Sequence, residues 1–302
     1  MDQLSQNLII KKINELLNSN VKITGTPPQG MDSEVFFVAD ENKKEFAIKY
    51  GTGVSVDVLT YDLLQANDIK VPFPKYFGTF MVNGKQVIIL EKYDFPLLET
   101  IPANKMARYI PSMLENLKEI HKIKFNIIDH SSWKNYLISK FNSSTPSLNW
   151  VKISKRNGLN KKLIIDSVEK ILNIINHTDF KSSSYSFLHT DFNQRNIFVD
   201  SNSNNIAGII DWGEATYGDP IYDFARVRMF IWHFNLGNKT VSKYNKLMDF
   251  TDQEKKLEEL YWTSRVIEYL AYYSEELNEF NIGRIKMHQD FLTNYNWTSI
   301  TI

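Results

Sequence analysis

Apolar positions in residues 1–90 follow first a helical spacing and then a strand spacing. Residues 4–18 place their apolar side chains on one face of a helix. Segments rich in β-branched and aromatic residues then alternate with polar turns, and a second helical pattern at 54–66 stops before the prolines of 71–74. The predicted strands are residues 21–24, 34–39, 45–50, 76–82 and 86–91. This order predicts an antiparallel sheet with one inserted helix, with a hairpin turn at Asn83-Gly84.

The pattern after residue 95 is mostly helical. The predicted helices are residues 103–123, 133–141, 161–177, 223–235, 252–278 and 283–295. The only strands expected in this half are two short runs, 196–200 and 206–210, joined by the polar turn SNSNN. This pattern of strands and helices therefore predicts an α+β protein with two lobes. The expected divisions are a β-rich lobe at 1–90, a hinge at 91–95 and a helical lobe at 96–302.

Composition narrows the classes of function. The 302 residues, 43% of them hydrophobic, suffice for two lobes with a core and argue against extensive disorder. Lys+Arg and Asp+Glu number 35 each, so no overall basic field draws nucleic acid or an anionic membrane. The absence of cysteine excludes disulfides, thiolate catalysis and Cys-ligated zinc. Without a signal-peptide pattern or a membrane-length apolar run, we expect a cytoplasmic protein with neither a nucleic-acid nor a membrane partner.

The strongest local motif is HTDFNQRN, which precedes the first of the two short strands in the helical half. Asp191 and Asn196 lie in this motif, and Asp211 follows the second strand, so a hairpin brings all three together. The Asn196 amide and the Asp211 carboxylate suit a divalent cation, and Asp191 is left to accept a proton. Asp and Asn are also common as plain turn residues. The spacing of 15 residues between Asn196 and Asp211 across a predicted hairpin argues against that alternative.

Lys49 lies in FAIKY, on a predicted strand with apolar neighbours. A lysine that points inward from a sheet needs an anion, such as a nucleotide phosphate, whereas a lysine on an edge strand would face water. Asp57 and Asp62 on the following helix are candidate partners for its ammonium group. Asp57 is preferred because it lies near the start of the helix, although an exposed helix carboxylate is the more ordinary case.

The loop QGMDS, residues 29–33, lies between two predicted strands. Gly30 can let the backbone approach a phosphate, and Ser33 can donate a hydrogen bond to it. An ordinary hairpin turn accounts for the loop equally well. Two further acids, Asp219 and Asp223, directly precede a predicted helix, and we expect both to be structural, through bonds to loop amides or charge at the helix start.

Together these motifs resemble the aminoglycoside phosphotransferase family, small-molecule kinases with a protein-kinase-like fold. HTDFNQRNIFVD is similar to that family's catalytic loop, and GIIDWGEATYGDPIYDFAR to its metal-binding segment and following helix. Four further segments are similar to motifs of that family in their order and spacing: FAIKY, QGMDS, VPFP and LEKYDF. The similarity therefore runs from about residue 20 to residue 235. The stretch after Asp211 looks most like the hygromycin-type branch. The resemblance implies the two-lobed, protein-kinase-like form of the predicted α+β fold.

The resemblance also implies a reaction, in which the γ-phosphate of ATP or GTP passes to a hydroxyl of an aminoglycoside-type antibiotic. Asp191 would be the catalytic base, and Asn196 and Asp211 would hold Mg²⁺. Lys49 would contact the α- and β-phosphates, oriented by Asp57. The family usually has Glu where this chain has Asp57, so the identity of the lysine's partner stays open.

The resemblance assigns the remaining nucleotide contacts to the hinge and to the first loop. Backbone groups of Glu91 and Tyr93 would meet the adenine, and Gly30 and Ser33 would lie at the phosphates.

For the acceptor, aminoglycosides are polycations, so acids are expected at their site. The candidates are Glu214, Glu268 and Glu275. Acids on the exposed face of an ordinary amphipathic helix are the alternative for the last two.

The motifs leave the acceptor open, because kinases of choline, amino alcohols and sugars share them. A metabolite kinase is therefore the main alternative to an antibiotic kinase with a role in antibiotic resistance. A nucleotide-binding pseudokinase is a further alternative, although no base or metal residue is degraded here. The choice between ATP and GTP, the hydroxyl phosphorylated and the oligomeric state also stay open.

Overall fold

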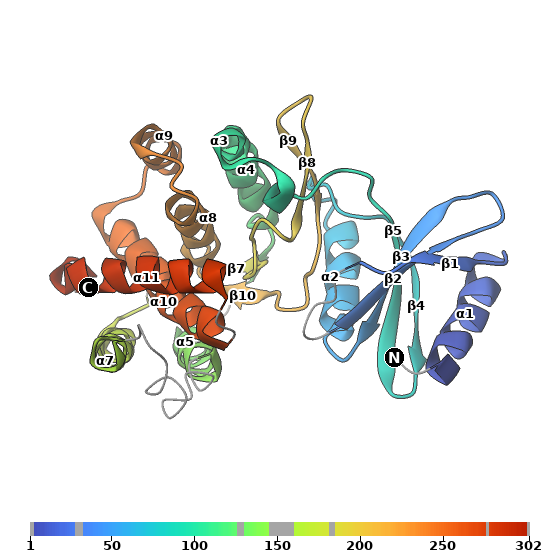
Figure 1. The fold of residues 1–302 in the computed structure, drawn as a ribbon, viewed down its shortest axis with the longest axis horizontal. Coiled ribbons are helices and arrows are strands. Elements are labelled where there is room, and N and C mark those ends of the chain that lie inside the picture. Colours follow the sequence, from blue (N-terminus) through green and yellow to red (C-terminus); the bar gives the residue numbers. More distant parts are fainter. Residues whose placement is uncertain are drawn as a thin grey trace. The chain divides into compact units, whose positions relative to one another are not determined.

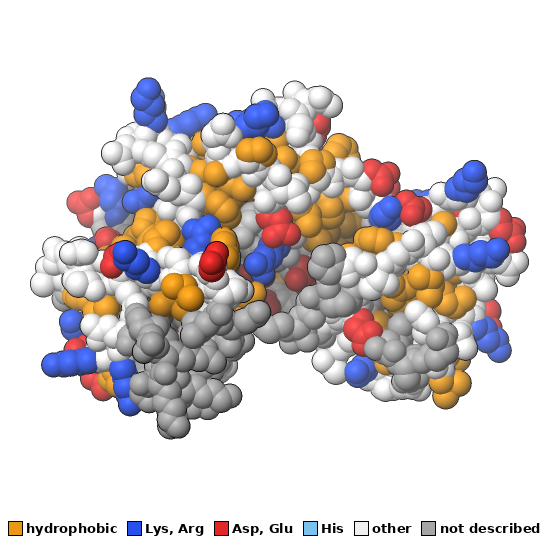
Figure 2. Space-filling model, in the orientation of Figure 1, with side chains coloured by type: hydrophobic (Ala, Val, Ile, Leu, Met, Phe, Trp, Pro, Cys, Tyr) orange, Lys and Arg blue, Asp and Glu red, His pale blue; other side chains and the backbone are white. Residues whose placement is uncertain are grey.

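The computed structural model describes residues 3–27, 33–125, 130–144, 160–180, 185–275 and 278–300. The chain forms two compact units. Unit 1 is Met1–Ile123 with Phe187–Thr216, and unit 2 is Lys124–Ser186 with Tyr217–Ile302. None of the described helices combines the length and apolar character that a membrane span requires. Acidic and basic side chains are interspersed on the face drawn in Figure 2, in keeping with the equal numbers of the two charges.

Unit 1 contains the predicted sheet (Figure 1). Its strands are β1 (Lys22–Gly25), β2 (Ser33–Ala39), β3 (Glu45–Gly51), β4 (Tyr76–Val82) and β5 (Lys85–Glu91), with helices α1 (Gln3–Leu17) and α2 (Val54–Ala66). The strands pair antiparallel in the order β1-β2-β3-β5-β4. Each strand begins and ends within one residue of its prediction, because the alternation of side chains and the turn residues are both explicit in the sequence.

The alternation along β3 decides which of its side chains enter the core. Phe46 and Ile48 are buried and pack in one cluster with Ile9 and Ile13 of α1. Because successive side chains of a strand point to opposite faces, Lys49 lies on the other face of the sheet. Helix α2 packs against strands β3 and β5, and its Asp57 meets Lys49 there.

Helix α2 places one acid on a buried apolar stripe. Val54, Asp57, Tyr61 and Leu64 recur three or four positions apart and are all buried. A carboxylate at such a position costs free energy unless it is paired. The helical pattern therefore explains why Asp57, rather than the exposed Asp62, is the acid that faces the sheet.

The segment after the sheet differs from its prediction. The single helix expected at 103–123 is instead α3 (Ala103–Met106), a 3₁₀ turn (Ala107–Tyr109) and α4 (Ile110–Ile120). Pro111 lies in the first turn of α4. Proline has no backbone N–H for a helix interior but fits the start of a helix, so the chain begins a new helix there.

The hairpin predicted at 196–210 is present in unit 1. Strands β8 (Ile197–Asp200) and β9 (Asn205–Ile209) pair antiparallel (Figure 1). Helix α4 packs against β9, where the Ser112 hydroxyl accepts a hydrogen bond from the Ile206 amide at 3.0 Å. The hairpin is thereby fixed to the helix, which gives the residues at its ends a rigid base.

Unit 2 is mostly helical. Its helices are α5 (His130–Ser144), α7 (Lys161–His177), α8 (Ile221–His233), α9 (Asn238–Met248), α10 (Asp252–Glu275) and α11 (Glu279–Asn294), followed by a 3₁₀ turn (Trp297–Ile300). Helix α10 packs against α8, α11, α5 and α7 and is the centre of this unit. The antiparallel N-terminal sheet and the helical remainder confirm the predicted α+β class.

Two features of the second half were not predicted. Strands β6 (Lys124–Phe125), β7 (Tyr185–Leu188) and β10 (Thr216–Gly218) form a further small sheet, so the expectation of only two strands there was wrong. Helix α9 was missed because only Thr240 and Tyr244 of its residues are buried, which leaves too little apolar periodicity to see.

Asp219 and Asp223 have the structural positions expected of them. Asp219 accepts hydrogen bonds from the Ile221 amide and from the Tyr261 hydroxyl, at 3.0 Å each. It thereby joins the start of α8 to α10. Asp223 is fully buried in the first turn of α8, where the helix dipole stabilises a negative charge.

The buried Tyr244 of α9 contacts both α8 and α10. The Tyr244 hydroxyl lies 3.0 Å from the Phe224 carbonyl oxygen and makes a very short hydrogen bond with the Glu258 carboxyl group. One hydroxyl carries only one proton, so it can give a full hydrogen bond to only one of the two oxygens. Both bonds form if Glu258 is protonated and donates to Tyr244, which then donates to Phe224. Burial raises the pKa of Glu258 to about 7, in agreement with this arrangement.

We expect Glu258→Gln to remove a pH dependence of stability. Between pH 4.5 and about 7 the folded wild type holds a proton that the unfolded chain has lost, so its free energy of unfolding falls as pH rises. Glutamine keeps a donor for Tyr244 without a titrating group. Urea denaturation across this window should show the variant gaining roughly 2–4 kcal/mol relative to wild type. Parallel pH profiles for the two proteins would contradict the assignment.

Candidate functional site

The segment between β7 and β8 brings Asp191 and Asn196 into contact. The Asn196 side-chain amide donates to both the carbonyl oxygen and Oδ2 of Asp191, at 2.9 Å each. Asn196 is buried and Asp191 is half-buried. The amide nitrogen of Asn196 is thereby used to fix Asp191, and the amide oxygen is the atom that can bind a cation.

His189 contacts the backbone of the segment between β7 and β8. Its ring is fully buried and lies 4.4 Å, between ring centroids, from Trp212. Nδ1 accepts a hydrogen bond from the Asp191 amide at 3.3 Å, and Nε2 lies 3.0 Å from the Ile210 carbonyl oxygen. These partners require the tautomer with its proton on Nε2. His189 therefore joins the backbone of Asp191 to the end of the hairpin.

Two residues of the site have left-handed backbone conformations. Thr190 has φ = 62° and Asp211 has φ = 64°. A β-branched residue such as threonine rarely adopts this region. Thr190 is fully buried, and its hydroxyl donates to the Glu214 carbonyl oxygen at 2.9 Å. Such conformations cost free energy and persist only where surrounding contacts impose them, as at functional sites.

Lys49 is held between two carboxylates. Its Nζ lies 2.7 Å from Asp57 Oδ2 and 2.6 Å from Asp211 Oδ1. The other oxygen of Asp57 accepts the Trp212 amide at 2.8 Å. Burial alone would lower the pKa of Lys49, but the charges of Asp57 and Asp211 raise it above its usual value. The lysine is therefore a fixed cation, and the expected pairing with Asp57 is present.

We expect Asp57→Asn to loosen Lys49 and weaken nucleotide binding. Asparagine keeps an oxygen for the Trp212 amide but removes the charge on a residue that is almost fully buried. Since Lys49 retains Asp211, we expect a loss of about 1–3 kcal/mol in the free energy of unfolding. We also expect about tenfold weaker nucleotide affinity. Urea denaturation and nucleotide titration measure the two effects. The exposed Asp62→Asn on the same helix is the control, and equal behaviour of both variants would contradict the role.

The predicted hinge lies against the hairpin. The ring of Tyr93 packs so closely on β9 that a Cβ atom at Gly208 would lie 1.9 Å from it. Tyr93 also contacts the Phe198 ring edge-to-face, with centroids 5.3 Å apart. The Glu91 amide donates to the Lys75 carbonyl oxygen at 2.8 Å. The hinge backbone is thus fixed from both sides within unit 1.

The other predicted site residues are spread over the two units. Gly30 lies outside the described residues, and Ser33 begins β2, opposite Gly51. Glu214 is exposed in the turn after Trp212. Glu268 pairs with Arg265, with 2.5 Å between Oε2 and Nη1. Glu275 is the last residue of α10, and its side chain lies outside the described residues.

The donor atoms of the predicted metal site fit Mg²⁺. Magnesium prefers oxygen and in nucleotide enzymes takes only one or two protein ligands besides phosphate oxygens. Asn196 offers its amide oxygen, and the side chain of Asp211 is 49% exposed despite its contact with Lys49. The described residues contain no cluster of three or more His, Cys, Asp or Glu that could hold a metal alone. The site therefore suits a cation that arrives with a phosphate.

Three supporting contacts were not predicted from the sequence. They are the hydrogen bond from the Trp212 amide to Asp57, the hydrogen bond from the Thr190 hydroxyl to the Glu214 carbonyl oxygen, and the packing of the Tyr93 ring against Gly208. Gly208, within the predicted strand at 206–210, is the one signal that was available, since glycine within a strand often marks a close approach. Backbone amides and a buried threonine carry no such signal.

Comparisons with known proteins agree with this geometry. Residues 28–247 match the phosphotransferase enzyme family. No curated protein sequence is significantly similar to the chain. A thermostable mutant of aminoglycoside phosphotransferase APH(4)-Ia, in ternary complex with AMP-PNP and hygromycin B, superposes with a TM-score of 0.66 at 14% identity, over 94% of this chain and 97% of that one. The gentamicin complex of APH(2")-IIa gives 0.62 at 15% identity, over 100% and 99%.

Proposed function

The chain belongs to the phosphotransferase enzyme family, and we propose that it transfers the γ-phosphate of ATP or GTP to a hydroxyl group of an aminoglycoside-type antibiotic. The phosphotransferase activity toward hydroxyl groups follows from the family and its structural relatives. The observation that carries the proposal is the contact of Lys49 with both Asp57 and Asp211. This contact joins the sheet that would bind phosphates to the end of the hairpin that would bind their metal.

Asp191 is proposed as the catalytic base. In the transfer, the acceptor oxygen bonds to the γ-phosphorus, the bond from that phosphorus to the nucleotide breaks, and the hydroxyl proton moves to the Asp191 carboxylate. Asn196 and His189 hold this residue through its side chain and its backbone. Since phosphoryl transfer depends mainly on position and on charge neutralisation, a fixed carboxylate is the property that the reaction requires.

Lys49, Asp57, Asn196 and Asp211 are proposed to hold the metal-bound nucleotide. Lys49 would contact the α- and β-phosphates while Asp57 keeps its ammonium group in place. Asn196 and Asp211 would hold Mg²⁺, which when bound neutralises charge on the phosphates. Asp211 now contacts Lys49, so nucleotide binding would exchange part of this ion pair for contacts with phosphate and metal. Gly30 and Ser33 are proposed as further phosphate contacts.

The hinge at 91–95 is proposed to bind the base and to divide a nucleotide-binding lobe at 1–90 from a helical lobe at 96–302. Because the Glu91 amide is engaged with Lys75, its carbonyl oxygen and the Tyr93 backbone are the groups proposed to meet the purine. The position of Tyr93 is fixed by the packing of its ring against Gly208. A related structure, the GDP complex of an aminoglycoside 2'-phosphotransferase-IIIa mutant (TM-score 0.62, 14% identity, 97% and 96% of the two chains), supports GTP beside ATP as a donor to test.

The acceptor is proposed to be a cationic aminoglycoside, because the similar structures were determined with hygromycin B and gentamicin. Glu214, Glu268 and Glu275 are the proposed contacts, which would give the protein a place in antibiotic resistance in the cytoplasm. The ion pair of Glu268 with Arg265 weakens the attraction of that acid for a cation. This pairing favours, as a second candidate, a less strongly charged metabolite such as an amino alcohol or sugar.

A panel assay tests the proposed function. Purified protein is incubated with Mg²⁺, with ATP or GTP, and with each of a set of aminoglycosides, choline, amino alcohols and sugars, and phosphorylated acceptor is measured. We expect turnover of an aminoglycoside and none with Mg²⁺ omitted. Turnover of a metabolite at micromolar KM without antibiotic turnover would support the second candidate. Nucleotide binding without transfer to any acceptor would contradict both.

A further inference from the structure

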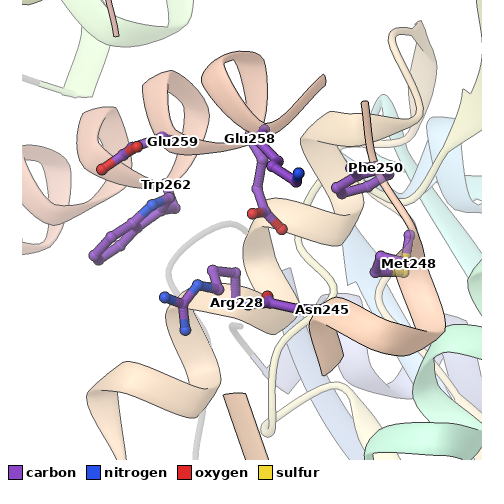
Figure 3. Close-up of a pocket in the computed structure, with 8 residues that line it drawn as sticks. Arg228, Asn245, Met248, Phe250, Glu258, Glu259 and Trp262 are labelled. Atoms are coloured by element: carbon purple, nitrogen blue, oxygen red, sulfur yellow. The ribbon is translucent and has the colours of Figure 1, made fainter. Parts of the chain in front are cut away.

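A cavity of about 160 Å³ lies between α8, the end of α9 and the first turns of α10 (Figure 3). Arg228 of α8 and Glu258 and Trp262 of α10 line it, with Met248 and Phe250 from the end of α9 and the segment after it. All of these residues belong to unit 2, whereas Lys49, Asp57, Asp191, Asn196 and Asp211 belong to unit 1. The proposed transfer reaction uses none of the residues that line the cavity.

Arg228 brings a positive charge into this cavity. Its guanidinium group makes no hydrogen bond or ion pair with any residue that the structure describes, and it lies 5.8 Å from the centre of the Trp262 ring. Figure 3 shows it extending from α8 beneath that ring. Arginine stays charged at all relevant pH values and presents five N–H donors. A half-buried guanidinium group with five N–H donors can bind an anionic group of a ligand.

The acids beside the cavity do not cancel this charge. Glu258 and Arg228 are not joined by an ion pair, and burial raises the pKa of Glu258 to about 7, so at pH 6 its carboxyl group is mostly uncharged. Figure 3 shows the Glu259 carboxylate directed away from Arg228. Lys255, the other charged group here, pairs with Asp252 at 3.1 Å. Below pH 7 Arg228 therefore lines the cavity together with a mostly uncharged acid of α10 and the neutral Asn245 of α9.

We propose that this cavity binds a small monocarboxylate that carries an apolar group. Its carboxylate contacts Arg228, and its apolar part packs against Trp262, Phe250 and Met248. A cavity of roughly 150 Å³ is enough to accept one benzene ring, so the ligand is of that size rather than the size of a nucleotide or an aminoglycoside. A planar carboxylate matches the fork of N–H donors of the guanidinium group.

The site couples ligand binding to the protonation of Glu258. An anion on Arg228 repels a carboxylate at Glu258, so the protein with protonated Glu258 binds the ligand more tightly. Since the pKa of Glu258 is raised to about 7, the affinity is highest below this pH and falls as the pH rises through it. The charged groups that face Glu258 are Arg228 and the neighbouring Lys255 and Glu259, and Tyr244 faces it as its hydrogen-bond partner.

Calorimetric titration of the full-length protein with benzoate tests the proposal. We expect a Kd on the order of 1 mM or tighter at pH 6, at least tenfold tighter than for acetate, which lacks the apolar part, or for benzyl alcohol, which lacks the charge. Arg228→Gln should weaken benzoate binding by about tenfold or more. Lys239→Gln on α9 removes an equal charge from an exposed position outside the cavity and should leave the affinity unchanged.

The Glu258→Gln variant tests the expected pH dependence of benzoate affinity. Wild-type affinity should fall several-fold from pH 6 to pH 8, and the variant, which cannot ionise, should keep the same affinity at both. Thermal unfolding of each variant establishes that it is folded. No binding of benzoate by the wild type at 10 mM (roughly ten times the expected Kd) would overturn the proposal. Equal affinity in Arg228→Gln and wild type, or affinity for acetate equal to that for benzoate, would also overturn it.

Discussion

Asp191→Asn is expected to lower kcat by about 10²–10⁴-fold while leaving nucleotide affinity within about twofold of wild type. Asparagine has the shape of aspartate and keeps an oxygen for the Asn196 amide, which lies 2.9 Å from Asp191 Oδ2. What it loses is the negative charge and the capacity to accept the hydroxyl proton. Lys49, Asp57 and Asp211 are untouched, so the contacts proposed for the nucleotide remain.

Steady-state kinetics with a phosphorylated acceptor, together with nucleotide titration, separate these two effects. The matched control is Asp62→Asn, which removes the same charge from an exposed position of α2. Its kcat should equal that of wild type. An equal loss of transfer and nucleotide affinity in Asp191→Asn would mean that Asp191 acts in nucleotide binding or folding and not as the base.

Asp211→Asn is expected to act on the metal rather than on the acceptor. Removal of its charge should weaken binding of the Mg²⁺-nucleotide by about 10–100-fold and make transfer require far more Mg²⁺. Without Mg²⁺ the effect should vanish or reverse, because Asp211 now competes with phosphate for Lys49, at 2.6 Å from its Nζ. This change of behaviour with Mg²⁺ distinguishes a metal ligand from a residue that only supports the fold.

The measurement is nucleotide affinity at several Mg²⁺ concentrations, including none, for wild type and Asp211→Asn. Asp200→Asn serves as control, since Asp200 lies at the other end of the same hairpin and is bonded only locally, through Ser203 and the Asn202 amide. If Asp211→Asn and wild type showed the same Mg²⁺ dependence, the metal role of Asp211 would be wrong.

The parts of the site that follow a repeating pattern were predictable. Strand alternation put Lys49 on a definite face of the sheet, and the hairpin brought the segment with Asp191 and Asn196 to the strand that ends before Asp211. Helical spacing put Asp57 on the buried side of α2. In each case the period of the backbone fixes the direction of a side chain, so the sequence is sufficient.

The parts that depend on long-range partners were not predictable. Nothing in the sequence indicates that Thr190 adopts φ = 62°, because threonine is disfavoured there and the conformation is imposed by surrounding contacts. Likewise, Glu268 has the helical position of an exposed acid, and only the fold brings Arg265 against it. Helix α9 carries so few buried residues that its helical pattern is weak.

Mass spectrometry of the acceptor shows directly whether this protein phosphorylates an aminoglycoside. Hygromycin B and gentamicin are incubated with Mg²⁺, ATP or GTP, and either wild type or Asp191→Asn at equal concentration. We expect wild type to add one phosphoryl group to a hydroxyl of at least one of them and Asp191→Asn to add none in the same time. Equal phosphorylation by both proteins, or no phosphorylated acceptor from a wild type that binds the nucleotide, would contradict this expectation.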